Sequence, residues 1–162
     1  MKLGSKGRYA VMAMVDLADQ LGAGPKSGPI TLADIAGRQE ISLSYLEQLF
    51  SKLRKAGLVK SVRGPGGGYV LARPARELRI SDIVLAVDEP LRATRCQPGS
   101  GRGCMADGSR CLTHDLWDEL GNQIYNFLST VSLEDVCARR IRPPRSATLV
   151  PAAPAFTPDT TE

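Results

Sequence analysis

Three stretches near the start of the chain place apolar residues at a helical period and predict three helices. They cover 5–20, 31–36 and 42–55, and Ser5 and Thr31 are the expected N-caps of the first two. The third stretch has a narrow apolar stripe that must face a core. That stripe consists of Leu46, Leu49, Phe50 and Leu53.

A glycine-rich ribbon follows the third predicted helix. Residues 58–62 and 69–72 alternate as two strands, and 63–68 form the turn between them. Residues 37–41 form the expected turn between the second and third helices. The predicted order is therefore helix-turn-helix followed by a two-stranded wing. An ordinary amphipathic surface helix is the alternative for 42–55, and the wing directly after it favours DNA binding.

The side of the third helix that faces away from the core is polar and basic. It carries Ser44, Tyr45, Gln48, Lys52 and Lys55. In such a helix the N-terminal residues meet base edges and the lysines meet phosphates. In the wing, Arg63 is placed to enter a minor groove, and a glycine tip that includes Gly66 allows close approach of the backbone. No helix with Lys-Ser or Lys-Thr follows the glycines, so a nucleotide-binding loop is not expected.

The second half of the chain predicts a linker at 74–79, a short helix from Ser81 to about Val87, and a longer helix over 113–129. One or two helical turns are expected at 132–138. They hold Cys137, which is expected to be a buried free thiol because its neighbours are apolar.

The long helix carries more apolar surface than one core contact needs. We expect this stripe to form a two-fold dimer interface with a second copy. The alternative is that it packs back on its own domain, with the first helix covering part of it. The stripe consists of Leu116, Leu120, Ile124, Phe127, Leu128 and Val131, with Trp117 and Tyr125 beside it.

These patterns predict a mainly α fold with a small β wing. The expected organisation is a winged helix-turn-helix domain at 1–80, a cysteine loop and dimerisation helix at 81–138, and a disordered Pro-rich tail at 139–162. Charge supports a polyanion partner for the first part, because residues 1–80 have a net charge of +7 and residues 81–162 have −3. No apolar run is long enough for a membrane span and no signal peptide is recognisable, so a cytoplasmic location with reduced thiols is expected.

Three of the four cysteines and the single histidine lie within nineteen residues, in the pattern Cys-x7-Cys-x6-Cys-x2-His. Glycines between them mark a loop, in which thiolates and an imidazole can converge on a soft metal centre. By chemistry alone, a structural zinc ion suits these donors at least as well as an iron–sulfur cluster, and a disulfide switch is a third option. The four candidate ligands are Cys96, Cys104, Cys111 and His114.

With these motifs assembled, residues 1–137 resemble a family of bacterial dimeric winged helix-turn-helix transcription regulators with cysteine-ligated clusters. The stretch Cys111-Leu-Thr-His114 is characteristic of the branch of this family that senses iron–sulfur clusters. The two spacers between the first three cysteines are longer than this resemblance implies, which a glycine-rich loop tolerates because closure entropy grows slowly with length. The other matching stretches are Leu3-x-Ser-Lys-Gly-Arg-Tyr-Ala10, Ile41-Ser-Leu-Ser-Tyr-Leu-Glu-Gln-Leu-Phe50, Val62-Arg-Gly-Pro-Gly-Gly-Gly-Tyr69, Ala86-Val-Asp-Glu89 and Ala93-Thr-Arg-Cys96.

The resemblance implies a [2Fe–2S] cluster held by the four candidate ligands, with cluster occupancy changing which palindromic operators a homodimer binds. It implies regulation, mainly repression, of cluster-assembly genes, and contact with cluster-donating assembly proteins is a further expectation. It also implies that Glu47 discriminates between operator classes. A local alternative for Glu47 is a capping box with Ser44. The residues that would read DNA by this resemblance are Ser42, Ser44, Tyr45, Gln48 and Arg63.

Three other functions remain open from the sequence. They are a nitric-oxide-sensing or redox-sensing repressor of the same family, a zinc-stapled DNA-binding protein without sensing, and a protein–protein adaptor built on a winged fold. The polar and basic face of 42–55 argues against the adaptor. An enzyme is not expected, because the chain has one histidine and no recognisable catalytic set.

Overall fold

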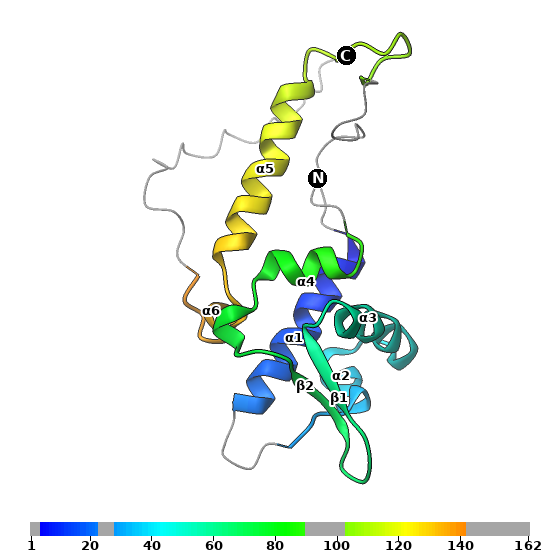
Figure 1. The fold of residues 1–162 in the computed structure, drawn as a ribbon, viewed down its shortest axis with the longest axis vertical. Helices are drawn as coiled ribbons and strands as arrows, with labels where there is room; N and C mark the ends of the chain where they lie inside the picture. The colour runs from blue at the N-terminus through cyan, green and yellow to red at the C-terminus, as the bar shows by residue number, and fades with distance from the viewer. Residues whose placement is uncertain (1–3, 23–27, 90–102, 142–162) are drawn as a thin grey trace, which may run out of the picture.

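The computed structural model describes residues 4–22, 28–89 and 103–141, and within these ranges it is mainly helical with one small antiparallel sheet. The predicted fold class is confirmed. Figure 1 shows a winged domain from which α5 and the β1–β2 hairpin extend toward opposite ends of the long axis. In chain order the elements are α1 Ser5–Gly22, α2 Leu32–Gln39, α3 Leu43–Lys55, β1 Val59–Val62, β2 Gly68–Leu71, the short 3-10 helix η1 Ala75–Glu77, α4 Ile80–Ala86, α5 His114–Thr130 and α6 Leu133–Cys137.

Local capping fixes the ends of α2 and α3. The Thr31 hydroxyl accepts a hydrogen bond from the backbone N–H of Asp34 (3.1 Å), which confirms the predicted N-cap of α2. The expected turn at 37–41 begins too early, because α2 continues to Gln39 and ends at Glu40, which adopts a left-handed φ of 54°. A residue in the left-handed conformation ends a helix, and here Glu40 adopts this conformation although glycine is the usual residue at such a position.

The start of α3 corrects one prediction. Ser42 is the N-cap, and its hydroxyl accepts from the Tyr45 backbone N–H at 3.4 Å. Ser44 is therefore inside the helix, and the capping box proposed between Ser44 and Glu47 is wrong. At the other end, Gly57 has φ +72° and the Leu58 N–H donates to the Leu53 carbonyl at 3.0 Å, a glycine-dependent helix stop.

The wing is a hairpin with a third backbone partner. β1 and β2 pair in antiparallel register from Val59–Leu71 to Val62–Gly68. On the outer side of β2, Ile30 and Tyr69 exchange two backbone hydrogen bonds of 3.0 and 2.7 Å. This bridge, which the sequence pattern did not reveal, ties the wing to the segment before α2. Gly68 has no room for a side chain there, because a Cβ would overlap the Ile30 carbonyl.

One hydrophobic core joins both sides of the predicted boundary at residue 80. α4 and α6 pack against α1, and backbone hydrogen bonds from Ile80 to Val131 (3.0 Å) and from Leu133 to Leu78 (2.8 Å) close the domain. The core contains Ala10, Ala13, Met14, Leu17, Leu32, Ile35, Ile41, Leu46, Leu49, Phe50, Leu53, Leu58, Val59, Leu78, Ile80, Ile83, Val84, Val87, Val131 and Leu133.

A buried ion pair links α1 to α2. Asp16 is almost fully buried, and it receives hydrogen bonds from Arg38 at 2.6–3.1 Å and from the Gln39 amide at 2.7 Å. The hydrogen bond that Arg38 donates to Asp16 is the main reason why the pKa of Arg38 is raised. Because both carboxylate oxygens are satisfied, burial of this charge is tolerated.

The last elements differ from prediction in detail. α4 begins at Ile80 with Arg79 as its N-cap residue, and Ser81, the expected cap, is buried inside the helix. α6 begins after Ser132, which forms a reciprocal capping box with Asp135. Cys137 is only half-buried, so the prediction of a buried thiol is wrong in degree, although burial does raise its pKa. Of the predicted tail, 142–162 lie outside the described residues.

Candidate functional site

The outward ridge of α3 is the candidate nucleic-acid interface. The four core residues of α3 are buried, whereas Ser42, Ser44 and Gln48 are exposed in the first three turns. Tyr45 is half-buried, and its ring meets Tyr9 of α1 edge-on at 6.0 Å between centroids. The structure therefore places the predicted base-reading residues together at the N-terminal half of α3. It also adds Tyr9 as the support of Tyr45, which sequence reasoning missed.

Glu47 is exposed in the same half of α3, on the turn between Ser44 and Gln48. Since Ser42 caps the helix, this carboxylate is not used to hold the helix N-terminus. Its position beside the predicted base-reading residues is compatible with the predicted role in operator discrimination.

Lys52 lies on the same ridge, two turns after Ser44, and it already has an anionic partner. Its ammonium group is 2.7 Å from Oδ2 of Asp88, which follows α4. The hydrogen bond from Lys52 and then its charge lower the pKa of Asp88, and Lys6 adds a smaller effect in the same direction. Asp88 was not among the predicted site residues, and the only sequence signal for it is the motif at 86–89.

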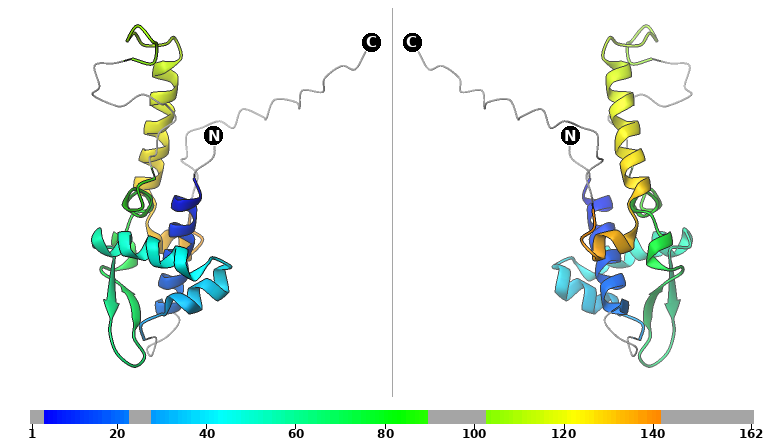
Figure 2. Two further views of the ribbon diagram at one scale, coloured as in Figure 1. Left: turned by 90° about the vertical axis from the view of Figure 1, so that its right-hand side faces the viewer. Right: turned by 90° about the vertical axis from the view of Figure 1, so that its left-hand side faces the viewer.

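The wing tip exposes Arg63 and Gly66 as predicted. Gly64 and Gly66 have φ of +107° and +71°, and the Gly67 N–H donates to the Gly64 carbonyl at 2.9 Å. These conformations explain the glycines, because L side chains rarely adopt them. Both views in Figure 2 place the tip at the end of the molecule remote from α5.

The described part of the cysteine loop, residues 103–113, leads directly into α5. A small backbone turn organises it, with the Gly103 N–H donating to the Gly108 carbonyl at 2.8 Å and the Met105 N–H to the Ser109 carbonyl at 3.1 Å. Gly108 has φ +85°, and a Cβ on Gly103 would overlap the Ser109 carbonyl. The two glycines therefore allow the loop to fold back before Cys111.

Two of the predicted ligands meet at this loop. Cys104 Sγ lies 3.1 Å from Nδ1 of His114, the first residue of α5. Cys111 Sγ instead lies 3.6 Å from the Thr113 hydroxyl. Cys96 lies outside the described residues, and within 4–22, 28–89 and 103–141 no three His, Cys, Asp or Glu side chains converge as a metal site would require.

The chemistry of the donors fits a soft metal centre. Two thiols and an imidazole within eleven residues are ligands for zinc and for iron–sulfur clusters alike. Cys104 is exposed and Cys111 and His114 are half-exposed, so small side-chain rotations meet no core packing. The structure thus brings two of the four candidate donors, Cys104 and His114, into contact.

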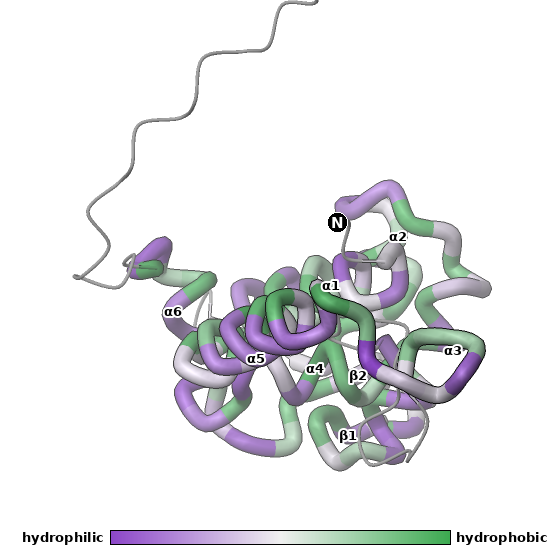
Figure 3. The backbone as a smooth tube through the Cα atoms, turned by 90° about the horizontal axis from the view of Figure 1, so that it is seen from above, coloured by the Kyte–Doolittle hydropathy of each residue, from purple (hydrophilic) through white to green (hydrophobic). Residues whose placement is uncertain are grey.

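Above the winged domain, α5 presents an apolar face to solvent. Leu116 is 62% exposed, and Trp117, Leu120, Tyr125 and Phe127 are each more than a third exposed. Only the C-terminal end of the predicted stripe is covered, where Ile124 and Leu128 pack against the core and Val131 is buried. The main neighbour of α5 is α4, rather than the predicted α1. Seen from above, hydrophobic and hydrophilic residues alternate around the turns of α5 (Figure 3).

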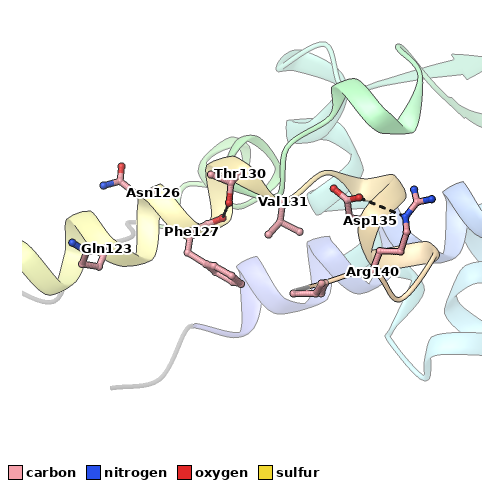
Figure 4. A pocket seen from close by; sticks show the side chains of 8 residues that line it. Gln123, Asn126, Phe127, Thr130, Val131, Asp135 and Arg140 are labelled. Carbon is pink, nitrogen blue, oxygen red and sulfur yellow. Dashed lines mark hydrogen bonds and ion pairs between the residues drawn. The ribbon is translucent and has the colours of Figure 1, made fainter. Parts of the chain in front are cut away.

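A pocket of about 410 Å³ lies at the base of α5, and sequence reasoning did not predict it. Figure 4 shows side chains from α5 and from the segment around α6 surrounding it, with Arg140 reaching Asp135 at 3.8 Å. None of the predicted ligands and none of the α3 ridge residues line it. None of the described helices is long and apolar enough to cross a membrane.

Comparison with known proteins agrees with this geometry. The HTH-type transcriptional regulator IscR of Photorhabdus laumondii is 57% identical over 136 residues, which cover 84% of this chain and 79% of the relative. IscR of an Escherichia coli strain is 52% identical over 136 residues, with 84% of this chain and 80% of the relative covered.

Two solved structures share the fold at lower identity. T. potens IscR superposes with a TM-score of 0.68 at 37% identity, covering 87% of this chain and 89% of that one. CymR, described as the global cysteine regulator of B. subtilis, has a TM-score of 0.68 at 32% identity, covering 86% and 98%. Residues 3–139 match the Rrf2 family, described as an iron-dependent transcriptional regulator. The chain therefore belongs to the Rrf2 family of winged-helix transcriptional regulators.

Proposed function

We propose that this protein is a DNA-binding transcription regulator, mainly a repressor, that senses iron–sulfur clusters and controls genes for their assembly. The observation that carries DNA binding is the α3 ridge, where an apolar face is buried and the opposite face exposes polar side chains next to a glycine-tipped wing. The naming of the relatives supports the sensing part. Such a protein would act in the cytoplasm, where DNA and reduced thiols occur together.

In this proposal α3 lies in the major groove. Ser42, Ser44, Tyr45 and Gln48 contact base edges, and Lys52 contacts a phosphate. Arg63 enters the adjacent minor groove while the backbone at Gly66 approaches the DNA. Tyr9 holds Tyr45 in place from behind, so the tyrosine hydroxyl can face the groove without a large loss of side-chain entropy.

The cluster-binding part of the proposal assigns Cys96, Cys104, Cys111 and His114 as ligands of a [2Fe–2S] cluster. The 3.1 Å approach of Cys104 to His114 supports this assignment. When bound, such a cluster supplies a labile, redox-active centre whose occupancy reports cluster supply. His114 couples loop order to α5, because it is both a proposed ligand and the first residue of that helix.

We further propose a homodimer that pairs through α5. Five large side chains are exposed on one helix, which is more than isolated surface leucines explain. A two-fold dimer would bury this face and match a palindromic operator. Transfer from cluster-donating assembly proteins would then take place at the exposed loop around Cys104.

Glu47 is the proposed discriminator. Its carboxylate stands between base-reading residues and repels electron-rich base edges or phosphates, so only operators that tolerate it are bound without the cluster. Glu47→Ala should relax this discrimination while leaving the fold unchanged, because the side chain is exposed.

The cluster hypothesis is tested by anaerobic purification with visible absorption spectra and analysis of iron, sulfide and zinc. Visible absorption from the cluster, with equal amounts of iron and sulfide, is expected. A colourless protein with one zinc per chain would instead establish a structural staple, the function that these donors support second best.

DNA recognition is tested separately with a triple variant in which Cys96, Cys104 and Cys111 are replaced by alanine. We expect loss of binding to one operator class and retention of another, since α3 and the wing are untouched. Equal loss of all DNA binding would show that the cysteines are structural and would refute the switch.

A further inference from the structure

Two carboxylates that follow α4 tie three elements together. Asp88 Oδ2 accepts from Lys52 of α3 at 2.7 Å, and Glu89 Oε1 accepts from the Gly4 backbone N–H at 3.0 Å, at the start of α1. A Cβ at Gly4 would overlap the Glu89 carboxylate, so this carboxylate would have to move away from the start of α1. Asp88 also adopts a left-handed φ of 57°, a conformation that aspartate and asparagine tolerate.

This arrangement bears on DNA binding through Lys52. Ser44, Gln48 and Lys52 follow one another at intervals of four, so they lie on one ridge of α3. The helix itself is held by its buried core residues and does not need Asp88 for its position. What Asp88 determines is where the Lys52 ammonium group lies.

We propose that Asp88 competes with the DNA backbone for Lys52 and thereby restrains the DNA affinity of the recognition helix. This inference rests on the proposed function, in which the α3 ridge faces DNA. The Lys52 side chain is 38% exposed and that of Asp88 is 77% exposed, so water and ions reach the pair and it exchanges readily. A phosphate that replaces Asp88 gains from counterion release, and the displaced carboxylate remains beside it as a repulsive charge.

The surroundings keep this carboxylate ionised. Lys52 and, more weakly, Lys6 lower the pKa of Asp88, so Asp88 carries its charge throughout the neutral range. Because a phosphate contact carries no sequence information, the restraint acts equally on all DNA sequences. Asp88 therefore sets the strength of binding, whereas Glu47 is proposed to set the choice of operator.

The test is Asp88→Asn, measured by binding to a mixed-sequence DNA duplex over a salt series from roughly 50 to 300 mM. Asparagine keeps the shape and tolerates the left-handed φ, so the fold should persist. We expect about three- to tenfold tighter binding at low salt and a log Kd against log salt slope that is steeper by up to about one. Asp88→Glu, which keeps the charge, should bind like the wild-type protein.

Two further variants make the result specific. Asp19→Asn makes the same change in net charge in the groove between α1 and α6, and it should leave binding unchanged. Lys52→Gln should weaken binding and flatten the salt slope, and in that background Asp88→Asn should change Kd less than about twofold.

The outcomes separate the two proposals. If Lys52→Gln leaves affinity and slope unchanged, the α3 ridge does not meet phosphates, and the proposed DNA face and this inference both fail. If Lys52→Gln weakens binding, the proposed DNA face stands, and three results would overturn only the inference about Asp88. In the first, Asp88→Asn weakens DNA binding. In the second, Asp88→Asn changes Kd no more than Asp19→Asn does, and in the third, it changes Kd equally with and without Lys52.

Discussion

The winged domain buries its large apolar side chains, whereas α5 leaves most of its own exposed. In the winged domain, Phe50, Met14 and Leu17 are fully buried, and α1 is covered by α4 and α6. Along α5, by contrast, Gly121 is the only residue between His114 and Thr130 that is fully buried. The winged domain is therefore complete within one chain, whereas α5 and its loop depend on something outside it, which we propose to be a second copy and a cluster.

The largest effect should come from damage to the complete region. Phe50 is fully buried and its ring meets Tyr69 of the wing at 4.9 Å. Phe50→Ala leaves a cavity and should lower the free energy of unfolding by about 3–5 kcal/mol in denaturant titrations. The matched change Leu120→Ala on α5 should lower the free energy of unfolding much less in dilute protein. Equal losses of unfolding free energy would contradict the difference between the two regions.

The next largest loss of stability should come from removing the buried charge of Asp16 in the same domain. Asp16→Ala leaves Arg38 without its carboxylate between α1 and α2, and the expected loss is about 2–3 kcal/mol, below the range for fully buried pairs because Arg38 is partly exposed. Urea unfolding with Asp19→Ala as the exposed control on the same helix measures it. A loss no larger than that of the control would mean that the pair is not a structural link.

On α5, substitution should change assembly more than folding. Leu120→Asp places a charge in the exposed apolar face and should weaken dimerisation at least tenfold, since burying one leucine contributes about 1.5–3 kcal/mol. Analytical ultracentrifugation over a concentration series measures this. Asn122→Asp, on the opposite side of the helix, is the control, and a wild-type protein that sediments as a monomer at micromolar concentration would contradict the dimer itself.

The smallest effect concerns the return of the chain into the winged domain. Ser132→Ala removes the α6 capping box and should cost about 1 kcal/mol. The Ser132 hydroxyl and backbone, with Arg140, lower the pKa of Asp135 below its ordinary 3.8. The ionised carboxylate thus stabilises the fold above that pH, and this stabilisation is lost as the pH falls through the lowered pKa of Asp135 in the folded state. In acid titration, the free energy of unfolding of Ser132→Ala should therefore depend less on pH in this range than that of the wild-type protein.

Local signals made most of the winged domain predictable. Apolar periodicity located α1 and α3, as well as α5 outside this domain, and the glycine-rich turn located the wing, because these features depend on neighbours within a few residues. The end of α2 and the starts of α3 and α4 were misplaced by one to three residues, because no glycine marks the left-handed position at Glu40 and both Ser42 and Ser44 have side chains able to cap α3.

The long-range parts of the site could not be predicted in this way. The contacts of Lys52 with Asp88 and of Glu89 with Gly4 join residues 36 and 85 positions apart, and no periodicity reports such pairs. The ligand set was recognisable from its residue types and spacing, and the approach of Cys104 to His114 agrees with it. The meeting of all four ligands stays a prediction.

The order of elements makes the proposed cluster-binding loop and α5 an insertion in a closed fold. The chain leaves the winged domain at Glu89 and re-enters at Val131, which pairs with Ile80 at the opposite end of α4. These two points are separated by about the length of that seven-residue helix, roughly 10 Å at 1.5 Å per residue. We therefore expect changes in loop length between them to leave the register of the DNA-binding unit intact, so that the inserted segment can vary while this unit stays the same.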